Sequence, residues 1–117
     1  MIYHLAKQQA WQAAQQSGIY RGLDADRGDG FLHFSTASQI VESARKHRAG
    51  EPDLVLLGVD EAPLGDDLVW EESRGGALFP HVYGTVPIEA VRLAAALPVD
   101  QNGLHVFPEL PDDNEPA

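Results

Sequence analysis

Apolar residues recur at helical spacing in the first half of the chain. Ala37, Ile40, Val41 and Ala44 are three or four positions apart, so residues 37–47 are predicted to form an amphipathic helix. A helix with one apolar side must place that side against a sheet or another helix. The sequence therefore predicts a packed helix at this point of a globular domain.

A second helix is expected over residues 7–17, where Gln and Ala dominate and Gly18 ends the element. The run 54–59 is almost entirely apolar, which is typical of a central strand buried on both faces. Residues 20–30 are rich in Gly and Asp and are predicted to form a loop, and residues 87–90 one helical turn. Shorter strands are expected at 2–5, 31–34, 68–70, 79–84, 91–97 and 104–107.

Many short strands and two clear helices predict an α+β domain, because the connections are too short for repeated parallel units. Residues 1–107 are expected to form this single domain, and residues 108–117 an acidic disordered tail in which Pro, Asp and Glu dominate. The chain has no cysteine, no signal-peptide pattern and no apolar run of membrane-spanning length. We therefore expect a cytoplasmic protein with no membrane partner.

The formal net charge of −10 argues against nucleic acid as a partner, because phosphate backbones are bound by basic surfaces. Residues 45–48 nevertheless hold three of the eight Lys and Arg residues. We interpret this basic run first as a helix C-terminus, where positive charge complements the helix dipole, and second as a phosphate contact.

Candidate chemistry gathers where a short apolar strand turns into the helix at 37–47. His33 and Ser35 are two positions apart and share a face of the strand, while Thr36 and Gln39 have capping-box spacing. An imidazole, hydroxyls and a helix N-terminus can together receive a polar ligand. The alternative is a core histidine beside hydroxyls that merely cap the helix, and this segment alone slightly favours that alternative.

Three of the five histidines stand in apolar strand surroundings: His4, His33 and His81. We expect all three to be partly buried, and a buried imidazole needs hydrogen-bond partners. Separate core hydrogen bonds would satisfy them, and so would convergence on one concave site, which is our prediction. His47 and His105 are expected at the surface.

Three converging imidazoles can bind zinc, but the histidines have no short helical spacing and no HExxH motif occurs. We therefore predict no metal site, and a three-histidine metal enzyme is only a second alternative. A hydrolase built on Ser35 and His33 has even less support, because no GxSxG motif is present.

Glu71 and Glu72 follow Trp70 in a predicted strand, so one of them points inward if the strand packs on one face. An inward carboxylate near histidines could act as a general base. The interpretation that we favour here is a buried Trp70 with both glutamates in solvent.

A series of motifs resembles one protein family over roughly the whole chain up to Leu97. In order, they lie at residues 2–4, at Trp11, Gly18 and Tyr20, and at residues 30–39, 53–57, 68–71 and 79–84. They resemble the bacterial domain of unknown function family 952. That family has no assigned activity, so the resemblance by itself implies no function.

The order of these motifs is also distantly similar to the catalytic half of RNA 2′-phosphotransferases and to the ADP-ribosyltransferase fold. This resemblance implies split antiparallel sheets with two main helices and a site for NAD or ADP-ribose. It implies His4 as the first motif, and Ser35 and Thr36 as the second. The third motif should supply a glutamate within residues 79–83, but this chain has none there and carries His81 instead.

The expected function is binding of a small polar ligand, with NAD or ADP-ribose as candidates, by a divergent transferase or hydrolase with a His-, Ser- and Thr-lined cleft. The missing glutamate favours the main alternative, a non-catalytic module that binds a small ligand or a protein. Candidate catalytic residues are His4, His33, His81 and Glu71, and candidate ligand-binding residues are His4, Ser35, Thr36 and Tyr83.

Overall fold

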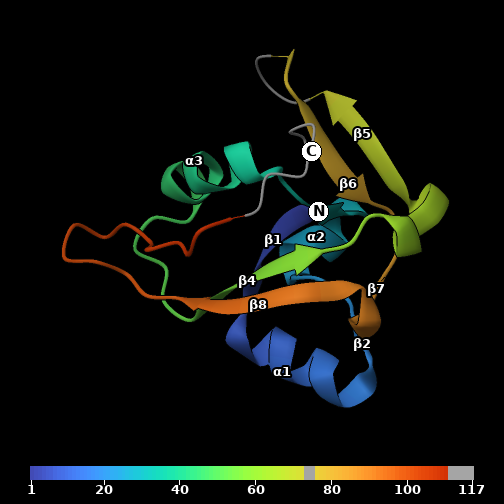
Figure 1. The fold of residues 1–117 in the computed structure, drawn as a ribbon, viewed down its shortest axis with the longest axis horizontal. Coiled ribbons are helices and arrows are strands. Elements are labelled where there is room, and N and C mark those ends of the chain that lie inside the picture. The colour runs from blue at the N-terminus through green and yellow to red at the C-terminus, as the bar shows by residue number, and fades with distance from the viewer. Residues whose placement is uncertain (73–75, 111–117) are drawn as a thin grey trace.

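The structure is a computed structural model that describes residues 1–72 and 76–110, without the side chains of residues 24, 25 and 27 (Figure 1). The fold is α+β, with short antiparallel sheets and few helices, as predicted. The elements are β1 (Ile2–Lys7), α1 (Gln8–Ser17), β2 (Ile19–Tyr20), α2 (Asp24–Asp29), β3 (Leu32–His33), α3 (Ala37–His47), β4 (Leu54–Val59), η1 (Ala62–Asp67), β5 (Leu68–Glu72), β6 (Leu78–Val82), β7 (Val86–Pro87), η3 (Ile88–Ala90) and β8 (Val91–Leu97).

The central sheet has the order β1-β4-β8 and is antiparallel throughout. All six residues of β4 are buried, which confirms the prediction of a central strand. Leu54 and Leu56 belong to the core on the α3 side, whereas Val55, Leu57 and Val59 belong to the core on the α1 side. Figure 1 shows the two helices on opposite sides of this sheet, so an uninterrupted apolar run is what the strand requires.

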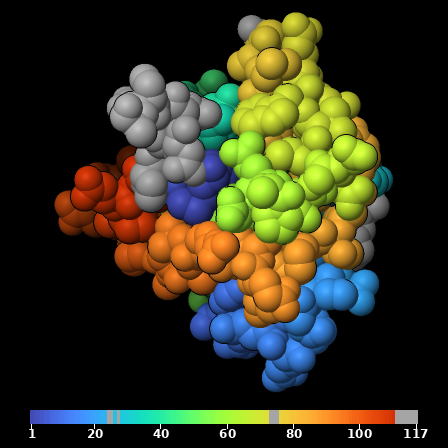
Figure 2. All heavy atoms as spheres, turned by 45° about the vertical axis from the view of Figure 1, so that its right-hand side comes forward, coloured from blue at the N-terminus to red at the C-terminus, as the bar shows by residue number. Residues whose placement is uncertain are grey.

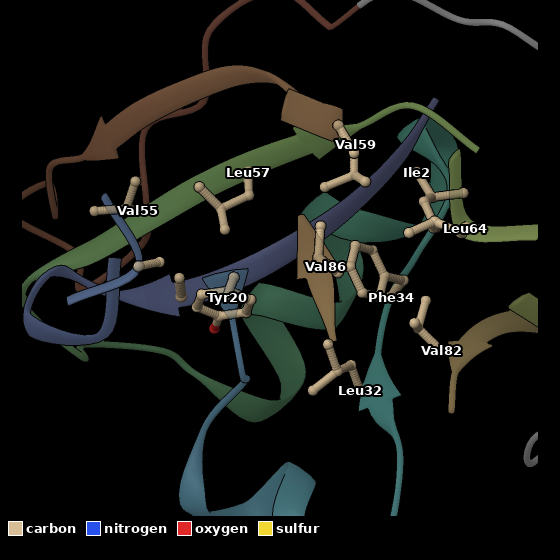
Figure 3. Packing of buried hydrophobic residues seen from close by; sticks show 13 residues of the cluster. Ile2, Tyr20, Leu32, Phe34, Val55, Leu57, Val59, Leu64, Val82 and Val86 are labelled. Atoms are coloured by element: carbon tan, nitrogen blue, oxygen red, sulfur yellow. The ribbon is translucent and has the colours of Figure 1, made fainter. Parts of the chain in front are cut away.

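Helix α3 has the bounds that its apolar periodicity predicts. Thr36 and Gln39 form a reciprocal capping box at its start, so the unpaired N–H groups of the first turn gain partners. Ile40 and Ala44 are buried against a cluster that includes Tyr3 of β1. In Figure 3, the cluster on the other side of the sheet includes Tyr20, Phe34 and Val86.

Two smaller sheets complete the fold, with the orders β2-β7 and β3-β6-β5. Strand β6 pairs His81 with His33 of β3 on one side and with Val69 of β5 on the other. An isolated bridge between Tyr3 and Ser35 joins β1 to the segment after β3. This bridge brings the neighbour of His4 next to Ser35. In Figure 2, β8 forms a band across the surface between α1 and the η1–β5 segment.

The prediction of a loop over residues 20–30 was wrong in part, because this segment contains the six-residue helix α2. Asp26 accepts a hydrogen bond from the backbone N–H of Leu23 at 2.8 Å and so caps its own helix. Gly30 ends the helix with a φ of 85°. The glycines and aspartates that suggested a loop are therefore the start and stop signals of a short helix.

The predicted strand over residues 104–107 does not form either. The segment makes an isolated bridge between Val99 and His105, because the side chain of Asp100 accepts the backbone N–H of Leu104 at 3.0 Å and holds a turn. Phe107 and Leu110 then pack against the core on the α3 side. Residues 111–117 of the predicted tail lie outside the described residues.

Within the part of the chain that the structure describes, no helix has the length and apolar character needed to cross a bilayer.

Candidate functional site

A cavity of about 300 Å³ is lined by residues of β1, α2, β3, α3 and β6. Its lining includes the three histidines that the sequence singled out, His4, His33 and His81, together with Ser35. Hydrogen bonding between strands explains this convergence, since His33 pairs with His81 and Ser35 pairs with the neighbour of His4. The three imidazoles nevertheless have different surroundings.

His4 is almost completely buried, with 2% of its surface exposed. Its Nδ1 lies 2.7 Å from the carbonyl oxygen of His33, which can only accept, so Nδ1 carries the hydrogen. Nε2 then accepts a hydrogen bond from the Tyr20 hydroxyl at 2.6 Å. Burial lowers the pKa of His4 in spite of the nearby Asp26 charge, which favours this neutral form. Both ring nitrogens are therefore engaged, which favours a positioning role over direct contact with a ligand.

Asp26 is a site residue that the sequence reasoning missed. It is 3% exposed, and its carboxylate accepts the backbone N–H of Leu23, the backbone N–H of His33 at 3.1 Å and the His33 Nδ1–H at 2.7 Å. Burial alone would raise the pKa of Asp26, but the hydrogen bonds and the neighbouring histidines lower it. A buried carboxylate that is ionised and fully bonded can hold an imidazole in one orientation.

Gly22 is the one local signal that could have pointed to Asp26. Its φ is 83°, and a Cβ atom there would lie 2.1 Å from Leu32 Cδ2 and 3.1 Å from Asp26 Oδ2. Only glycine fits where the chain approaches this closely. The turn that delivers Asp26 to His33 thus depends on a glycine at this position.

His33 is the most exposed of the three histidines, with 48% of its side chain exposed. Its Nδ1 binds Asp26, and its Nε2 lies 3.2 Å from Oδ2 of the exposed Asp29. The hydrogen bond to Asp26 raises the pKa of His33, so the imidazolium persists to higher pH than for a free histidine.

His81 is held in a similar way by a different carboxylate. Its Nδ1 lies 2.7 Å from Oε1 of Glu71, and the same oxygen accepts the Tyr83 hydroxyl at 2.6 Å. The hydrogen bonds from Tyr83 and His81 lower the pKa of Glu71, whereas the bond to Glu71 raises the pKa of Tyr83. Glu71 is therefore an ionised acceptor, and the Nδ1–H tautomer leaves the Nε2 lone pair of His81 available.

The favoured interpretation of the Trp70 region was wrong for Trp70. Trp70 is 39% exposed rather than buried, because β5 is the edge strand of its sheet. Glu71 is 38% exposed and at the same time turns its carboxylate toward His81 of the neighbouring strand β6. The structure thus brings Glu71 and Tyr83 together beside His81, although neither lines the cavity as delimited among the described residues.

Phe31 connects His33, which is exposed, with His81, which is 13% exposed. Its ring stacks on His81 with centroids 4.2 Å apart, and it also contacts the rings of His33 at 4.7 Å and Tyr83 at 5.2 Å. The rings of His33 and His81 are themselves 5.7 Å apart. Sequence reasoning treated Phe31 only as a strand former, since its apolar character gives no sign of this contact.

The hydroxyls of Ser35 and Thr36, both predicted to bind the ligand, have different surroundings. Ser35 lines the cavity, is 6% exposed and, among the described residues, has no hydrogen-bond partner for its hydroxyl. Thr36 caps α3 instead: its N–H donates to Gln39 Oε1 at 3.0 Å and its hydroxyl lies 3.1 Å from that of Ser38. The hydroxyl that remains available to a ligand is therefore that of Ser35.

In the described ranges, 1–72 and 76–110, no group of three His, Asp or Glu side chains is arranged to hold a metal ion. A three-histidine set would also need a nitrogen of His4, and both of its ring nitrogens are engaged. Histidines as metal ligands need a free nitrogen facing the ion. The geometry therefore offers no support to the metal alternative.

Residues 5–94 match the model of a family described as "Protein of unknown function (DUF952)", so the chain belongs to this family. It is similar to the protein CC0527 from Caulobacter crescentus, whose crystal structure has 42% sequence identity and a TM-score of 0.85, covering 90% of this chain and 92% of that chain. The solution NMR structure of CC0527 gives 43% identity and a TM-score of 0.77, covering 88% and 89% of the two chains. No curated protein matches the chain. These comparisons establish the family and the fold, but they assign no activity.

Proposed function

We propose that the cavity binds a small polar ligand and that His33 and His81 act on it as an acid–base pair, in a transferase or hydrolase. One observation carries this proposal: two imidazoles with ring centroids 5.7 Å apart border one cavity, and each is held through Nδ1 by a carboxylate. A carboxylate on Nδ1 fixes the tautomer and orients Nε2, which is the arrangement that general acid–base catalysis requires.

The two histidines would have complementary roles. His33 has a raised pKa and is the group that would donate a proton, since Asp26 stabilises its cationic form. His81 would accept a proton at Nε2, because its Nδ1–H is committed to Glu71. Asp29 now lies beside His33 Nε2, but it is 56% exposed and can turn away when a ligand takes its place.

NAD and ADP-ribose are the ligands to test first. The order of the motifs, which resembles that of ADP-ribosyltransferases, supports this class, and the Ser35 hydroxyl is available to a ribose hydroxyl. The cavity volume of about 300 Å³ is at the lower end of the range for ligand sites, roughly 300–1,000 Å³, so it suits one nucleoside-sized part of such a molecule.

The residues fit full ADP-ribosyl transfer less well. A carboxylate is needed against the positive charge that develops on the ribose, and residues 79–83 contain none. Glu71 comes nearest, but its Oε1 already accepts hydrogen bonds from His81 and Tyr83. This engagement favours the alternative of a binding module without catalysis. Whether the protein is a divergent enzyme or a binding module, ADP-ribosyl transfer should be slow or absent.

The test combines binding with turnover. Thermal shift and calorimetry would measure binding of NAD and ADP-ribose, and nicotinamide release would measure reaction of NAD, for wild type, His33→Gln and His81→Gln. We expect weak binding, with a Kd near millimolar, about −4 kcal/mol. His33→Gln and His81→Gln should both abolish nicotinamide release while the protein stays folded. His105→Gln is the matched control, because the His105 ring is hydrogen-bonded to the backbone carbonyl of Glu51 and does not line the cavity.

The outcomes separate the alternatives. Binding without release by wild type would favour the binding module. Release that survives both substitutions together would rule out the acid–base pair. Absence of binding at millimolar concentration would rule out NAD and ADP-ribose as the ligand class.

A further inference from the structure

A second hollow, of about 440 Å³, adjoins the cavity along α3. The two share three lining residues, Ser43, His47 and Phe79. Ser43 and His47 are four positions apart on α3 and so lie one above the other on the same face. The cavity and the hollow are therefore consecutive parts of one groove.

Strand β6 provides the opposite wall of the groove. Gln39 Nε2 donates a hydrogen bond to the carbonyl oxygen of Leu78 at 2.9 Å, which ties the start of α3 to the start of β6. Phe79 follows Leu78 and lines both hollows. An aromatic side chain at this junction can pack against a flat or apolar part of a ligand that passes from one hollow to the other.

The basic run at the end of α3 borders this groove. Arg48 lines the cavity, Lys46 lines the second hollow, and His47 lines both. A helix C-terminus needs some positive charge, but it does not explain why these three side chains border a hollow in a protein with a net charge of −10. Local cations are what such a protein would need to hold an anionic ligand.

Lys46 is the member of this run that is most available to a ligand. Its side chain is 62% exposed, and its Nζ lies 3.6 Å from Glu42, a surface contact of small energy. Glu42 itself lines the second hollow, but Arg45 approaches the same Glu42 oxygen more closely, at 2.7 Å, and offsets its charge. Arg48, by contrast, is committed to Glu51 and to the carbonyl oxygen of Leu5.

We propose that the hollow beside Lys46 and His47 binds the phosphate group of an elongated ligand whose reacting end lies at His33 and His81. This inference rests on the proposed function and narrows its ligand class to phosphorylated sugars and nucleotides. Phe79 packs against the part between the two ends. Lys46 supplies a charge-assisted hydrogen bond to phosphate oxygen, and His47 adds a donor from the same helix face.

The test is calorimetry with two probes, ADP-ribose and inorganic pyrophosphate, on wild type and on three variants. Lys46→Glu reverses the charge in the hollow. Arg92→Glu is the matched control, because Arg92 is 63% exposed, lies 3.4 Å from Asp60 and sits on β8, and it lines none of the groove. His81→Gln alters the proposed reacting end.

We expect Lys46→Glu to weaken the binding of both probes at least tenfold and Arg92→Glu to weaken it less than twofold. His81→Gln should weaken ADP-ribose but leave pyrophosphate unchanged. Equal melting temperatures of the two charge-reversal variants would confirm that both are folded.

Each contrary result has a separate meaning. Equal losses in Lys46→Glu and Arg92→Glu would overturn the phosphate subsite, because net charge alone would then explain them. A loss in His81→Gln without one in Lys46→Glu would overturn the subsite and leave the proposed function standing. Pyrophosphate binding that depends on Lys46, without ADP-ribose binding, would support the subsite and reject the nucleotide ligand. Binding of neither probe at millimolar concentration would overturn the subsite.

Discussion

The two three-stranded sheets of this protein use histidine in opposite ways. In the sheet β1-β4-β8, His4 is enclosed and commits both ring nitrogens to Tyr20 and to the backbone of His33. In the sheet β3-β6-β5, His33 and His81 each bind a carboxylate through Nδ1, His33 Nε2 approaches only the exposed Asp29, and both rings border the cavity. The comparison teaches that surroundings, rather than residue type, separate a structural imidazole from a candidate functional one.

Coverage of the two sheets explains the difference. Helices α1 and α3 cover the sheet β1-β4-β8 on its two faces, so its side chains form the core. In the sheet β3-β6-β5, by contrast, three large apolar side chains are exposed, and so is the residue that follows β6. These four side chains are Val69, Trp70, Leu78 and Tyr83. Ligand sites need accessible side chains on a stable support. The sheet β3-β6-β5 supplies the accessible side chains, and the central sheet β1-β4-β8 supplies the stable support.

The largest expected effect contrasts leucines in the two sheets. Leu56 of β4 is completely buried, whereas Leu78 of β6 is 52% exposed. Leu56→Ala should lower the free energy of unfolding by roughly 2–5 kcal/mol through lost burial and a residual cavity, and Leu78→Ala by about 0.5 kcal/mol or less. Urea denaturation measures both changes, and similar losses would contradict the division between the sheets.

The next effect contrasts the histidines. His4→Ala should cost roughly 2–3 kcal/mol, because it removes two buried hydrogen bonds of the imidazole, to the Tyr20 hydroxyl and to the His33 carbonyl. His81→Ala loses its packing on Phe31 and a hydrogen bond to Glu71, whose carboxylate is 38% exposed and regains water, so it should cost about 1 kcal/mol or less. If His81→Ala were the more damaging change, the proposed separation of roles would fail.

The pH dependence of stability should also have opposite signs for the two sheets. The pKa of His4 is below the ordinary 6.5 in the folded state, so its unfolded form binds a proton first and the protein loses stability as pH falls below 6.5. The pKa of His33 is raised above 6.5, so its stabilising contribution is present below 6.5 and is lost as pH rises through the folded value.

Denaturation at several pH values checks these signs by comparing variants with wild type. The stability advantage of wild type over His33→Asn should shrink above pH 6.5, and that over His4→Gln should shrink below it. Asp26 adds a further loss in acid, because its pKa is below the ordinary 3.8 and its contribution disappears as the carboxylate is protonated. An advantage over His33→Asn that grows with pH would show that the Asp26–His33 pair is misassigned.

The smallest effect on stability is expected for Glu71→Ala. Glu71 is part of an exposed edge strand, so the melting temperature should change little. The tautomer of His81 should change, however, because Glu71 fixes the hydrogen on Nδ1. Nitrogen-15 spectra of the imidazoles report this directly, and Tyr83→Phe is the control that keeps the His81–Glu71 contact. An unchanged His81 tautomer in Glu71→Ala would remove the basis for its role as a base.

Prediction from sequence worked where one element carries its own signal. The period of apolar residues predicted α3 with its observed bounds, and the apolar run predicted β4. It did not work for α2, since a six-residue helix between glycines has too few turns to show a period. Asp26 was missed for a different reason: its importance comes from its contact with His33, seven residues further along the chain.

The sequence by itself determined the α+β class, the two longer helices, the central strand and the short list of histidines worth attention. These depend on spacing along the chain, since helices and strands each impose a local period on buried residues. Only the tertiary structure decided that His4 is enclosed, that His33 meets Asp26 and that Glu71 meets His81. Those contacts depend on strand register and on packing between elements far apart in the chain. Many weak interactions together determine that packing, and the local sequence pattern of one element does not contain them.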